Sequence, residues 1–154
     1  MELEDDRQAK RVSMMTDLTG ITEEMIADLV ATFYARVRQD PLLSPVFKRV
    51  KDWDAHLSRL RDFWSSVVLM SGRYHGQPML AHLSLPVDPQ HFDRWLALFE
   101  QAATDICPPK AAAHFVEKAR RIADSFEIGI ATQRGQIAAS RHAPGRLRPA
   151  SAVS

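Results

Sequence analysis

Hydrophobic residues between positions 20 and 133 recur at intervals of three and four, which is the spacing of one face of an α-helix. The first such series runs from Met25 to Val37. Thr22 precedes it as a candidate N-cap, and two glutamates follow in the first turn, where the helix dipole favours acidic side chains. The pattern predicts a helix that ends before the two prolines of "DPLLSPVF".

Three further series predict three more main helices. Asp52 opens a long series that ends near Gly72. Asp88 and Pro89 are typical of a helix start, because the aspartate can cap and proline lacks an N–H that the first turn would leave unpaired. The last series follows the prolines at 108 and 109, and "QPMLAHLSLP" allows only a short helix. Strand-like alternation is missing from the sequence, so we predict an all-α fold.

The two ends of the chain differ from this helical middle. Residues 1–19 are polar and mixed in charge, and we interpret them as a loosely ordered N-terminal segment. Residues 134–154 carry four arginines, no acid and few large apolar side chains, so we predict a disordered basic tail. The folded domain is therefore expected to span residues 20–133.

Composition narrows the class of protein. A chain of 154 residues with 45% hydrophobic residues can bury one core, and its net charge of +1 gives no general attraction to nucleic acid or membranes. The single cysteine, Cys107, excludes a disulfide framework and a thiolate zinc site. The acidic start is unlike a signal peptide and no apolar run approaches eighteen residues, so we expect a soluble cytoplasmic protein.

Four polar residues lie within the apolar stripes. Tyr34 lies on the buried side of the first helix, His56 shares a face with Trp53, and Trp95 faces inward on the third main helix. His82 lies on the helix that is too short to be stable by itself. Any one of them is typical of an ordinary core residue with its hydrogen bonds satisfied. Together they are costly to bury unless something occupies the space between them.

Several kinds of site are excluded. The spacing of His56 and His82 matches no helical zinc motif, the stripes hold no paired carboxylates, and no glycine-rich phosphate loop is present. A flat apolar cofactor would account for the whole set if its metal took one imidazole and its other face met the polar donors. The residues alone leave the ligand open among His75, His82 and His91.

Four segments of the sequence resemble the truncated haemoglobins, most closely those of group III. They are "TFYARVRQDPLLSPVF" (32–47), "HLSRLRDFW" (56–64), "YHGQPMLAHLSLP" (74–86) and "HFDRWLALFE" (91–100). They occur in the family's order and spacing within a similarity that covers about residues 20–132. The chain also lacks the paired glycines of the other two groups.

The resemblance implies a two-over-two helical sandwich around haem b, with His82 as the proximal iron ligand. His75 and His91 would then be surface groups at the edge of the pocket. The resemblance also implies a porphyrin-stacking Phe47 and a distal trio of Tyr34, His56 and Trp95. The remaining apolar walls would come from Leu60, Phe63, Leu83 and Phe99.

A haem site of this kind implies a protein that binds O2, CO and NO. Because bound O2 carries partial negative charge, two or three distal donors would hold it tightly, which favours trapping, sensing or redox chemistry over transport. The alternative is a haem-dependent redox enzyme, a nitric oxide dioxygenase or a peroxidase-like catalyst. Turnover would need an unidentified reductase, since the sequence has no flavin or nicotinamide motif. A third reading, a haem-free interaction module that docks through its basic tail, leaves His82 and the distal trio unexplained.

Overall fold

The computed structural model describes residues 2–78, 85–136 and 139–142, and all their regular structure is helical. The predicted all-α class is therefore confirmed. The short helix predicted within 77–86 falls largely on residues 79–84, which lie outside the described residues. The elements are α1 (Glu2–Thr19), α2 (Glu23–Val37), the 3-10 helix η1 (Ser44–Phe47), α3 (Trp53–Leu69), α5 (Pro89–Ile106) and α6 (Pro109–Gln133).

The predicted starts of α2, α3 and α5 are confirmed by their caps. The Thr22 hydroxyl accepts a hydrogen bond of 3.2 Å from the Met25 N–H, and an Asp52 carboxylate oxygen accepts one of 3.1 Å from the Ala55 N–H. At α5 the backbone N–H of Asp88 donates to Nδ1 of His91 over 2.9 Å. These local bonds satisfy groups that each helix leaves unpaired, and they determine where each helix begins.

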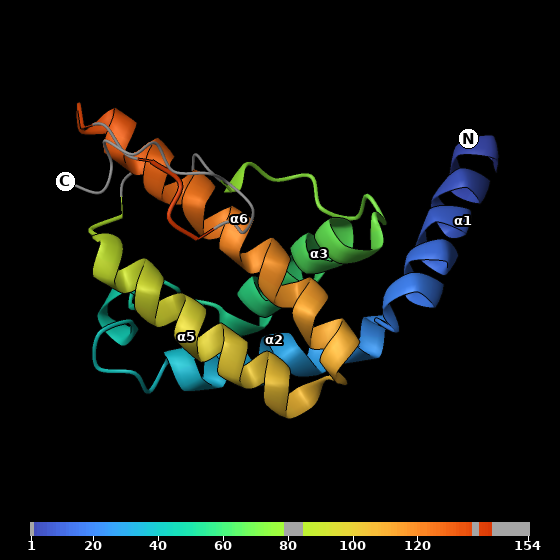
Figure 1. Ribbon diagram of the computed structural model, residues 1–154, viewed down its shortest axis with the longest axis horizontal. Coiled ribbons are helices and arrows are strands. Elements are labelled where there is room, and N and C mark those ends of the chain that lie inside the picture. Colours follow the sequence, from blue (N-terminus) through green and yellow to red (C-terminus); the bar gives the residue numbers. More distant parts are fainter. Residues whose placement is uncertain (1, 79–84, 137–138, 143–154) are drawn as a thin grey trace.

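The four main helices form two pairs packed one upon the other (Figure 1). Helix α2 packs on α3, α5 packs on α6, and the pairs meet where α2 crosses α5 and α3 contacts α6. The start of α5 and the end of α6 lie at the same side of the molecule (Figure 1). This arrangement leaves space between the pairs at that side, and the candidate site lies there.

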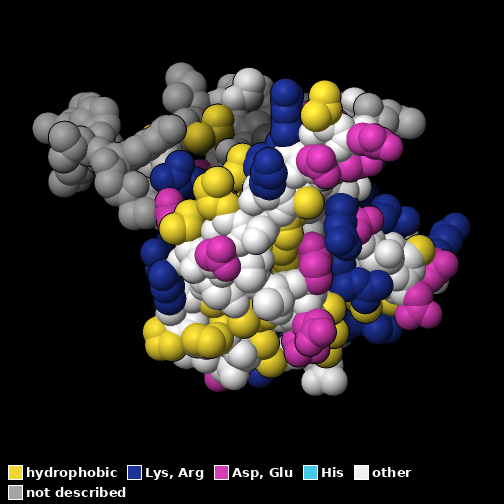
Figure 2. Space-filling model, turned by 90° about the vertical axis from the view of Figure 1, so that its right-hand side faces the viewer, with side chains coloured by type: hydrophobic (Ala, Val, Ile, Leu, Met, Phe, Trp, Pro, Cys, Tyr) yellow, Lys and Arg dark blue, Asp and Glu magenta, His cyan; other side chains and the backbone are white. Residues whose placement is uncertain are grey.

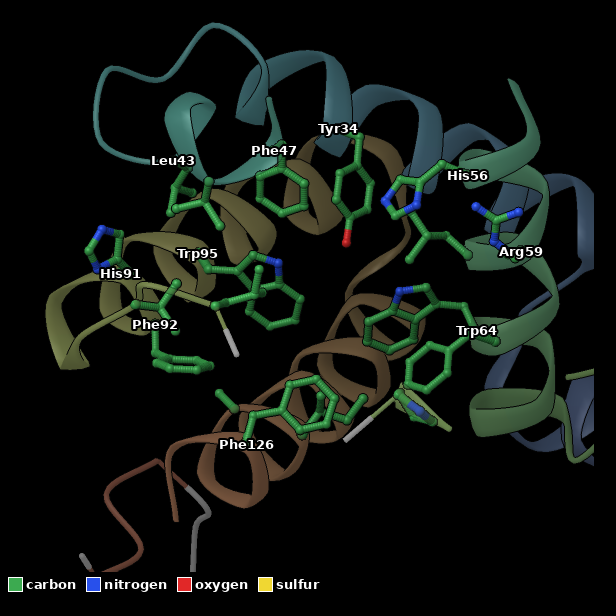
Figure 3. Close-up of a pocket in the computed structure, with 18 of the residues that line it drawn as sticks. Tyr34, Leu43, Phe47, His56, Arg59, Trp64, His91, Phe92, Trp95 and Phe126 are labelled. Carbon is green, nitrogen blue, oxygen red and sulfur yellow. The ribbon is translucent and has the colours of Figure 1, made fainter. Parts of the chain in front are cut away.

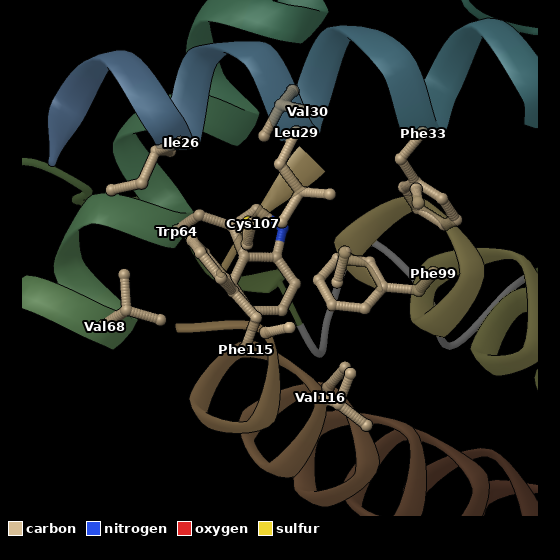
Figure 4. Packing of buried hydrophobic residues seen from close by; sticks show 14 of the residues in the cluster. Ile26, Leu29, Val30, Phe33, Trp64, Val68, Phe99, Cys107, Phe115 and Val116 are labelled. Carbon is tan, nitrogen blue, oxygen red and sulfur yellow. The ribbon is translucent and has the colours of Figure 1, made fainter. Parts of the chain in front are cut away.

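The core lies where the two pairs cross (Figure 4). Trp64 of α3 and Phe99 of α5 stack with ring centroids 4.9 Å apart, and Phe115 of α6 meets both at an angle. Phe33 of α2 contacts the edge of Phe99 at 5.1 Å. All four rings are at most 2% exposed, and burying each contributes about 1.5–3 kcal/mol to folding. The core thus joins all four helices around aromatic contacts.

The N-terminal segment is helical in the structure. Residues 2–19 form helix α1, which stands out from the body of the molecule (Figure 1). Val12 and Met15 of its second half pack against the core, whereas Leu3 near its start is 74% exposed. With so few apolar contacts the helix has almost no periodic signal in the sequence. Acidic residues in its first turn are favourable for the helix dipole.

The described part of the C-terminal segment packs against the helices. Helix α6 ends in a glycine cap: Gly135 has a φ of 74°, and the next N–H, that of Gln136, donates to the Ala131 carbonyl over 2.7 Å. Residues 139–142 then lie against α5 and α6 through hydrogen bonds to side chains of both helices. Residues 137–138 and 143–154 lie outside the described residues. The packed part of the segment depends on contacts far apart in the sequence, which local composition does not reveal.

The surface carries charges of both signs. On the face shown in Figure 2, acidic and basic side chains are interspersed, as the net charge of +1 leads one to expect. No helix among the described residues is long and apolar enough to cross a membrane.

Candidate functional site

A cavity of about 310 Å³ lies between the two helix pairs, lined by residues of α2, η1, α3, α5 and α6 (Figure 3). Its volume lies at the lower end of the range of about 300–1,000 Å³ that is usual for small-molecule sites. Most of its lining is apolar, with few polar groups. The aromatic members are Tyr34, Phe47, Phe63, Trp64, Tyr74, Phe92, Trp95 and Phe126.

The three predicted distal residues all line this cavity, although they come from three different helices. Tyr34 lies in the last turns of α2, His56 in the first turn of α3, and Trp95 in the second turn of α5. The rings of Tyr34 and His56 lie edge to face with centroids 6.1 Å apart. The Tyr34 hydroxyl points into the cavity (Figure 3). The packing of α2 against α3 and α5 therefore brings these polar groups together.

The Tyr34 hydroxyl keeps its proton at neutral pH. Burial raises the pKa of Tyr34 to about 12, while a hydrogen bond with the Trp95 side chain acts in the opposite direction. An indole can only donate, so the Trp95 N–H is the donor and the Tyr34 oxygen the acceptor. The phenolic O–H can in turn donate to an acceptor within the cavity.

His56 lies at the outer edge of the cavity against a second aromatic group. Its ring meets that of Trp53 at 89°, with centroids 5.2 Å apart, and its Nε2 is buried. The guanidinium of Arg38 lies over the Trp53 ring, 4.5 Å from its centroid. The imidazole thus lies between the cavity and a Trp53–Arg38 stack that faces outward.

An ion pair between the half-exposed Arg94 and the buried Asp40 holds the α2–η1 connection against α5 beside Trp95. Both Nε and an Nη of Arg94 lie 2.7 Å from a carboxylate oxygen of Asp40. The other oxygen of Asp40 accepts from the backbone N–H groups of Leu42 and Leu43. Burial acts to raise the pKa of Asp40, but these hydrogen bonds, that of Arg94 first, bring it below its ordinary value.

The predicted apolar residues divide into three sets. Phe47, Leu60 and Phe63 line the cavity. Phe99 is not in the lining of the described cavity: it is 1% exposed and lies parallel to Trp95, with centroids 5.5 Å apart. One turn beyond Trp95 on α5, it faces the core and supports the Trp95 ring from behind. Leu83, the remaining wall residue, lies outside the described residues and stays a prediction.

The three histidines that could serve as ligand also have different positions. His82 lies outside the described residues, but Pro78 and Leu85, on either side of its segment, both line the cavity. His91 lines the cavity as well, yet its Nδ1 accepts the Asp88 N–H and so caps α5. His75 is exposed and not in the lining.

Arg59 and Tyr74 are among the lining residues that were not predicted as site residues. Arg59, one turn after His56 on the same face of α3, is the one Lys or Arg in the lining formed by the described residues. Its spacing from His56 could have indicated it. Tyr74 packs edge-on against Phe63 with centroids 5.3 Å apart, and its N–H donates to the Ser66 hydroxyl. It lies in an irregular segment without periodicity, where the sequence gives no signal.

Chemically, the cavity can hold a flat apolar group. Aromatic and aliphatic side chains cover most of its wall, and Arg59 could meet an anionic edge. Tyr34, with the Trp95 N–H on its oxygen, supplies an O–H donor in a largely dry space, where a hydrogen bond to a small anionic or polarised ligand is strengthened. The described lining residues include no serine, threonine, cysteine or lysine nucleophile beside a base.

Comparison with known proteins gives consistent similarities. Residues 15–127 match the bacterial-like globin family. The group 3 truncated hemoglobin ctb of Campylobacter jejuni is 34% identical over 113 residues, which cover 70% of this chain and 89% of that protein. The group 2 truncated hemoglobin YjbI of Bacillus subtilis is 34% identical over 88 residues, 54% of this chain and 65% of that protein.

Solved structures show the same likeness. The crystal structure of the group III truncated hemoglobin from Campylobacter jejuni superposes with a TM-score of 0.64 at 34% identity, covering 70% of this chain and 89% of that one. The truncated oxygen-avid haemoglobin from Bacillus subtilis superposes with a TM-score of 0.61 at 25% identity, covering 70% and 94%.

Proposed function

Because this chain belongs to the bacterial-like globin family, as a truncated haemoglobin of group III, we propose that its cavity holds haem b and reversibly binds O2, CO or NO. The family membership and the globin fold confirm the predicted resemblance. A globin is a haem protein for diatomic ligands, and the finer assignment of ligands and residues is our proposal. The observation that carries it is the meeting of Tyr34, His56 and Trp95 in one mostly apolar cavity.

The residues present fit a haem. Phe47, Leu60 and Phe63 would contact the porphyrin as apolar walls, and the cationic Arg59 would face its carboxylates. We assign His82 as the protein ligand to the iron, because its segment begins and ends at cavity-lining residues and is too short to form a stable helix alone. When bound, haem would supply an iron that this imidazole could ligate and that could bind a diatomic ligand.

The chain's own polar groups would then act on the ligand. The Tyr34 O–H donates to it, and the Trp95 N–H, which donates to the Tyr34 oxygen, strengthens that donor by polarising it. The apolar wall excludes water that would compete for these hydrogen bonds. Each such bond contributes about 1–2 kcal/mol, or roughly five- to thirty-fold in affinity.

The same donors favour a second candidate, a redox enzyme such as a nitric oxide dioxygenase or a peroxidase-like catalyst. A ligand held by the Tyr34 O–H, itself strengthened by Trp95, would stay long enough to react rather than be delivered. Turnover would require electrons from a separate reductase. Steady consumption of NO by the O2-loaded protein with an added reductase would favour this candidate over simple binding.

The test of the proposal is a visible spectrum of the protein, purified or reconstituted with haem, in its ferric, ferrous and CO-bound forms. We expect a Soret band in each form, with a ferrous spectrum typical of a histidine ligand and a shift when CO is added. A protein that shows no Soret band after reconstitution would overturn the haem assignment altogether.

His56 is expected to control ligand entry. Its ring lies at the cavity edge against Trp53, while Tyr34, supported by Trp95, would already supply a hydrogen bond to the ligand. His56→Leu should therefore change CO association several-fold while affinity shifts only about two-fold, the effect of a weak donor. Flash photolysis measures the association rate, and His75→Leu, at an exposed position, is the matched control.

A contrary result for His56 would be spectroscopic. If the ferrous parent protein is low-spin and six-coordinate, and this spectrum disappears in His56→Leu, the imidazole binds iron directly and is not a gate. A loss of affinity through faster dissociation, with association unchanged, would instead make it a principal donor.

A further inference from the structure

We propose that the segment after α6 braces one wall of the cavity, with Arg134 and Arg141 as positioning residues. The wall consists of the described residues 85–95, of which Leu85, Val87, His91, Phe92 and Trp95 line the cavity. The brace itself is formed by contacts between described residues. Its effect on haem rests on the proposed function.

The wall begins with four residues outside any helix. Residues 85–88 precede α5, so few backbone hydrogen bonds of their own hold them. Val87 packs in a small apolar cluster with Val46 and Ile130, apart from the main core. A wall with so little regular structure needs contacts from neighbouring elements to keep its shape.

Arg134 supplies such a contact from the end of α6. One guanidinium nitrogen donates to the Leu85 carbonyl oxygen over 3.2 Å, and another lies 3.5 Å from a carboxylate oxygen of Asp88. The side chain thereby connects the C-terminal end of α6 with both ends of the irregular stretch. Asp88 also belongs to the cap of α5, so the contact reaches the start of the helix that carries Trp95.

Arg141 supplies a second contact further along α5. Its Nη2 lies 2.7 Å from a Glu127 carboxylate oxygen and 2.9 Å from one of Asp93, and it donates to the Pro89 carbonyl over 3.4 Å. Glu127 belongs to α6, whereas Pro89 and Asp93 form the first turns of α5. One planar guanidinium therefore bridges the two helices where the wall begins, as charge-assisted hydrogen bonds allow.

A buried carboxylate holds Arg141 in place. Asp124 of α6 is 5% exposed, and its Oδ1 accepts the backbone N–H groups of Arg141 and His142, each over 2.8 Å. Its Oδ2 accepts the Ser140 hydroxyl. A buried carboxylate requires hydrogen-bond donors, and residues 140–142 provide three. The segment is thus fixed at α6 before the Arg141 side chain extends to α5.

Asp124, Glu127 and His142 could also be interpreted as a cation site, since their potential ligand atoms lie within 4.8 Å of one another. The contacts favour the brace. The guanidinium of Arg141 already offsets the charge of Glu127, and Asp124 accepts backbone N–H groups that a cation would displace. Arg134 and Arg141 also lie beyond residues 15–127, the part that matches the globin family, so the brace is an addition to the matched domain.

The test compares the double variant Arg134→Ala/Arg141→Ala with the parent protein by two measurements. Hydrogen exchange of the as-purified protein reports on residues 85–95 directly, and transfer of haem to excess apomyoglobin reports on haem retention. We expect faster exchange confined mainly to residues 85–95 and haem loss that is about ten-fold faster, as for loss of charge-assisted contacts. Arg141→Lys keeps the positive charge but loses the planar guanidinium. Its exchange and haem-loss rates should therefore fall between those of the parent protein and the double variant.

Arg120→Ala is the matched control, because Arg120 also bridges α6 and α5, through Glu100, away from the cavity wall. It should leave both measurements within about two-fold of the parent protein, as an exposed ion pair does. Unchanged exchange at residues 85–95 in the double variant, or equal effects of Arg120→Ala, would overturn the brace. A parent protein that binds no haem would overturn the proposed function, and hydrogen exchange alone would then decide. If the double variant does not fold, Arg134→Gln and Arg141→Lys replace it in both measurements.

Discussion

Replacing His82 with glycine is expected to yield a folded protein with less than about a tenth of the parent's haem content, because the proposed iron–imidazole bond is its strongest link to the cofactor. The remaining contacts would be the apolar walls of Phe47, Leu60 and Phe63 and the cationic Arg59. Imidazole added to His82→Gly should occupy the vacated position and restore part of the ferrous spectrum. Haem content and the ferrous visible spectrum are the measurements.

The matched controls are the same substitution at the two neighbouring histidines. His75 is exposed, so His75→Gly should leave the spectrum and stability unchanged. His91→Gly removes the acceptor of the Asp88 N–H and should lower stability by about 1 kcal/mol while keeping a histidine-ligated spectrum. If His91→Gly instead abolishes that spectrum and His82→Gly keeps it, the assignment of the ligand is wrong.

The parts of the fold that the sequence predicts correctly have strong local signals. Thr22, Asp52 and Asp88 each combine a capping side chain with an apolar stripe, and each helix begins where its cap predicts. The cap fixes where each helix begins, and the apolar stripe shows which face is buried. The inward positions of Tyr34, His56 and Trp95 could therefore be predicted. Their convergence on one cavity needed the structure, since it depends on how the helices cross.

Other features of the structure depend on weak or distant interactions, which the sequence pattern does not reveal. Helix α1 has only Val12 and Met15 packed on the core, too few for a periodic signal. The segment at 139–142 is ordered by Asp124 and Glu127, whose partners lie about fifteen residues away along the chain. Phe99 shares its stripe with Trp95, but periodicity does not distinguish a residue beside the cavity from one a turn deeper.

Tyr34→Phe is expected to release O2 about ten-fold faster than the parent protein, the effect of losing one hydrogen bond of about 1.4 kcal/mol. The substitution removes only the hydroxyl, so the ring contacts with Phe33 and Phe47 remain. Because the pKa of Tyr34 is about 12, the group lost at neutral pH is a protonated donor. Stopped-flow dissociation of O2 and CO measures the effect, and CO, which carries less negative charge when bound, should change much less.

Tyr74→Phe is the matched control, because Tyr74 lines the same cavity and packs against Phe63 rather than beside Trp95. It should leave the O2 dissociation rate within about two-fold of the parent's, as expected when no bond to the ligand is lost. Equal acceleration for both gases in Tyr34→Phe would mean that cavity size, not hydrogen bonding, governs release. An unchanged rate for both would remove Tyr34 from the proposed ligand site.

Trp95→Phe should act in the same direction, and the two effects should not add. The Trp95 N–H donates to the Tyr34 oxygen, so in Trp95→Phe the tyrosine loses the group that polarises its own O–H. In Tyr34→Phe the indole loses its acceptor and can turn its N–H toward the ligand, which offsets part of the loss. The double variant should therefore release O2 at a rate that differs from the product of the two single effects, by a coupling of about 0.5 kcal/mol or more. Additive effects would show that the two donors act on the ligand independently.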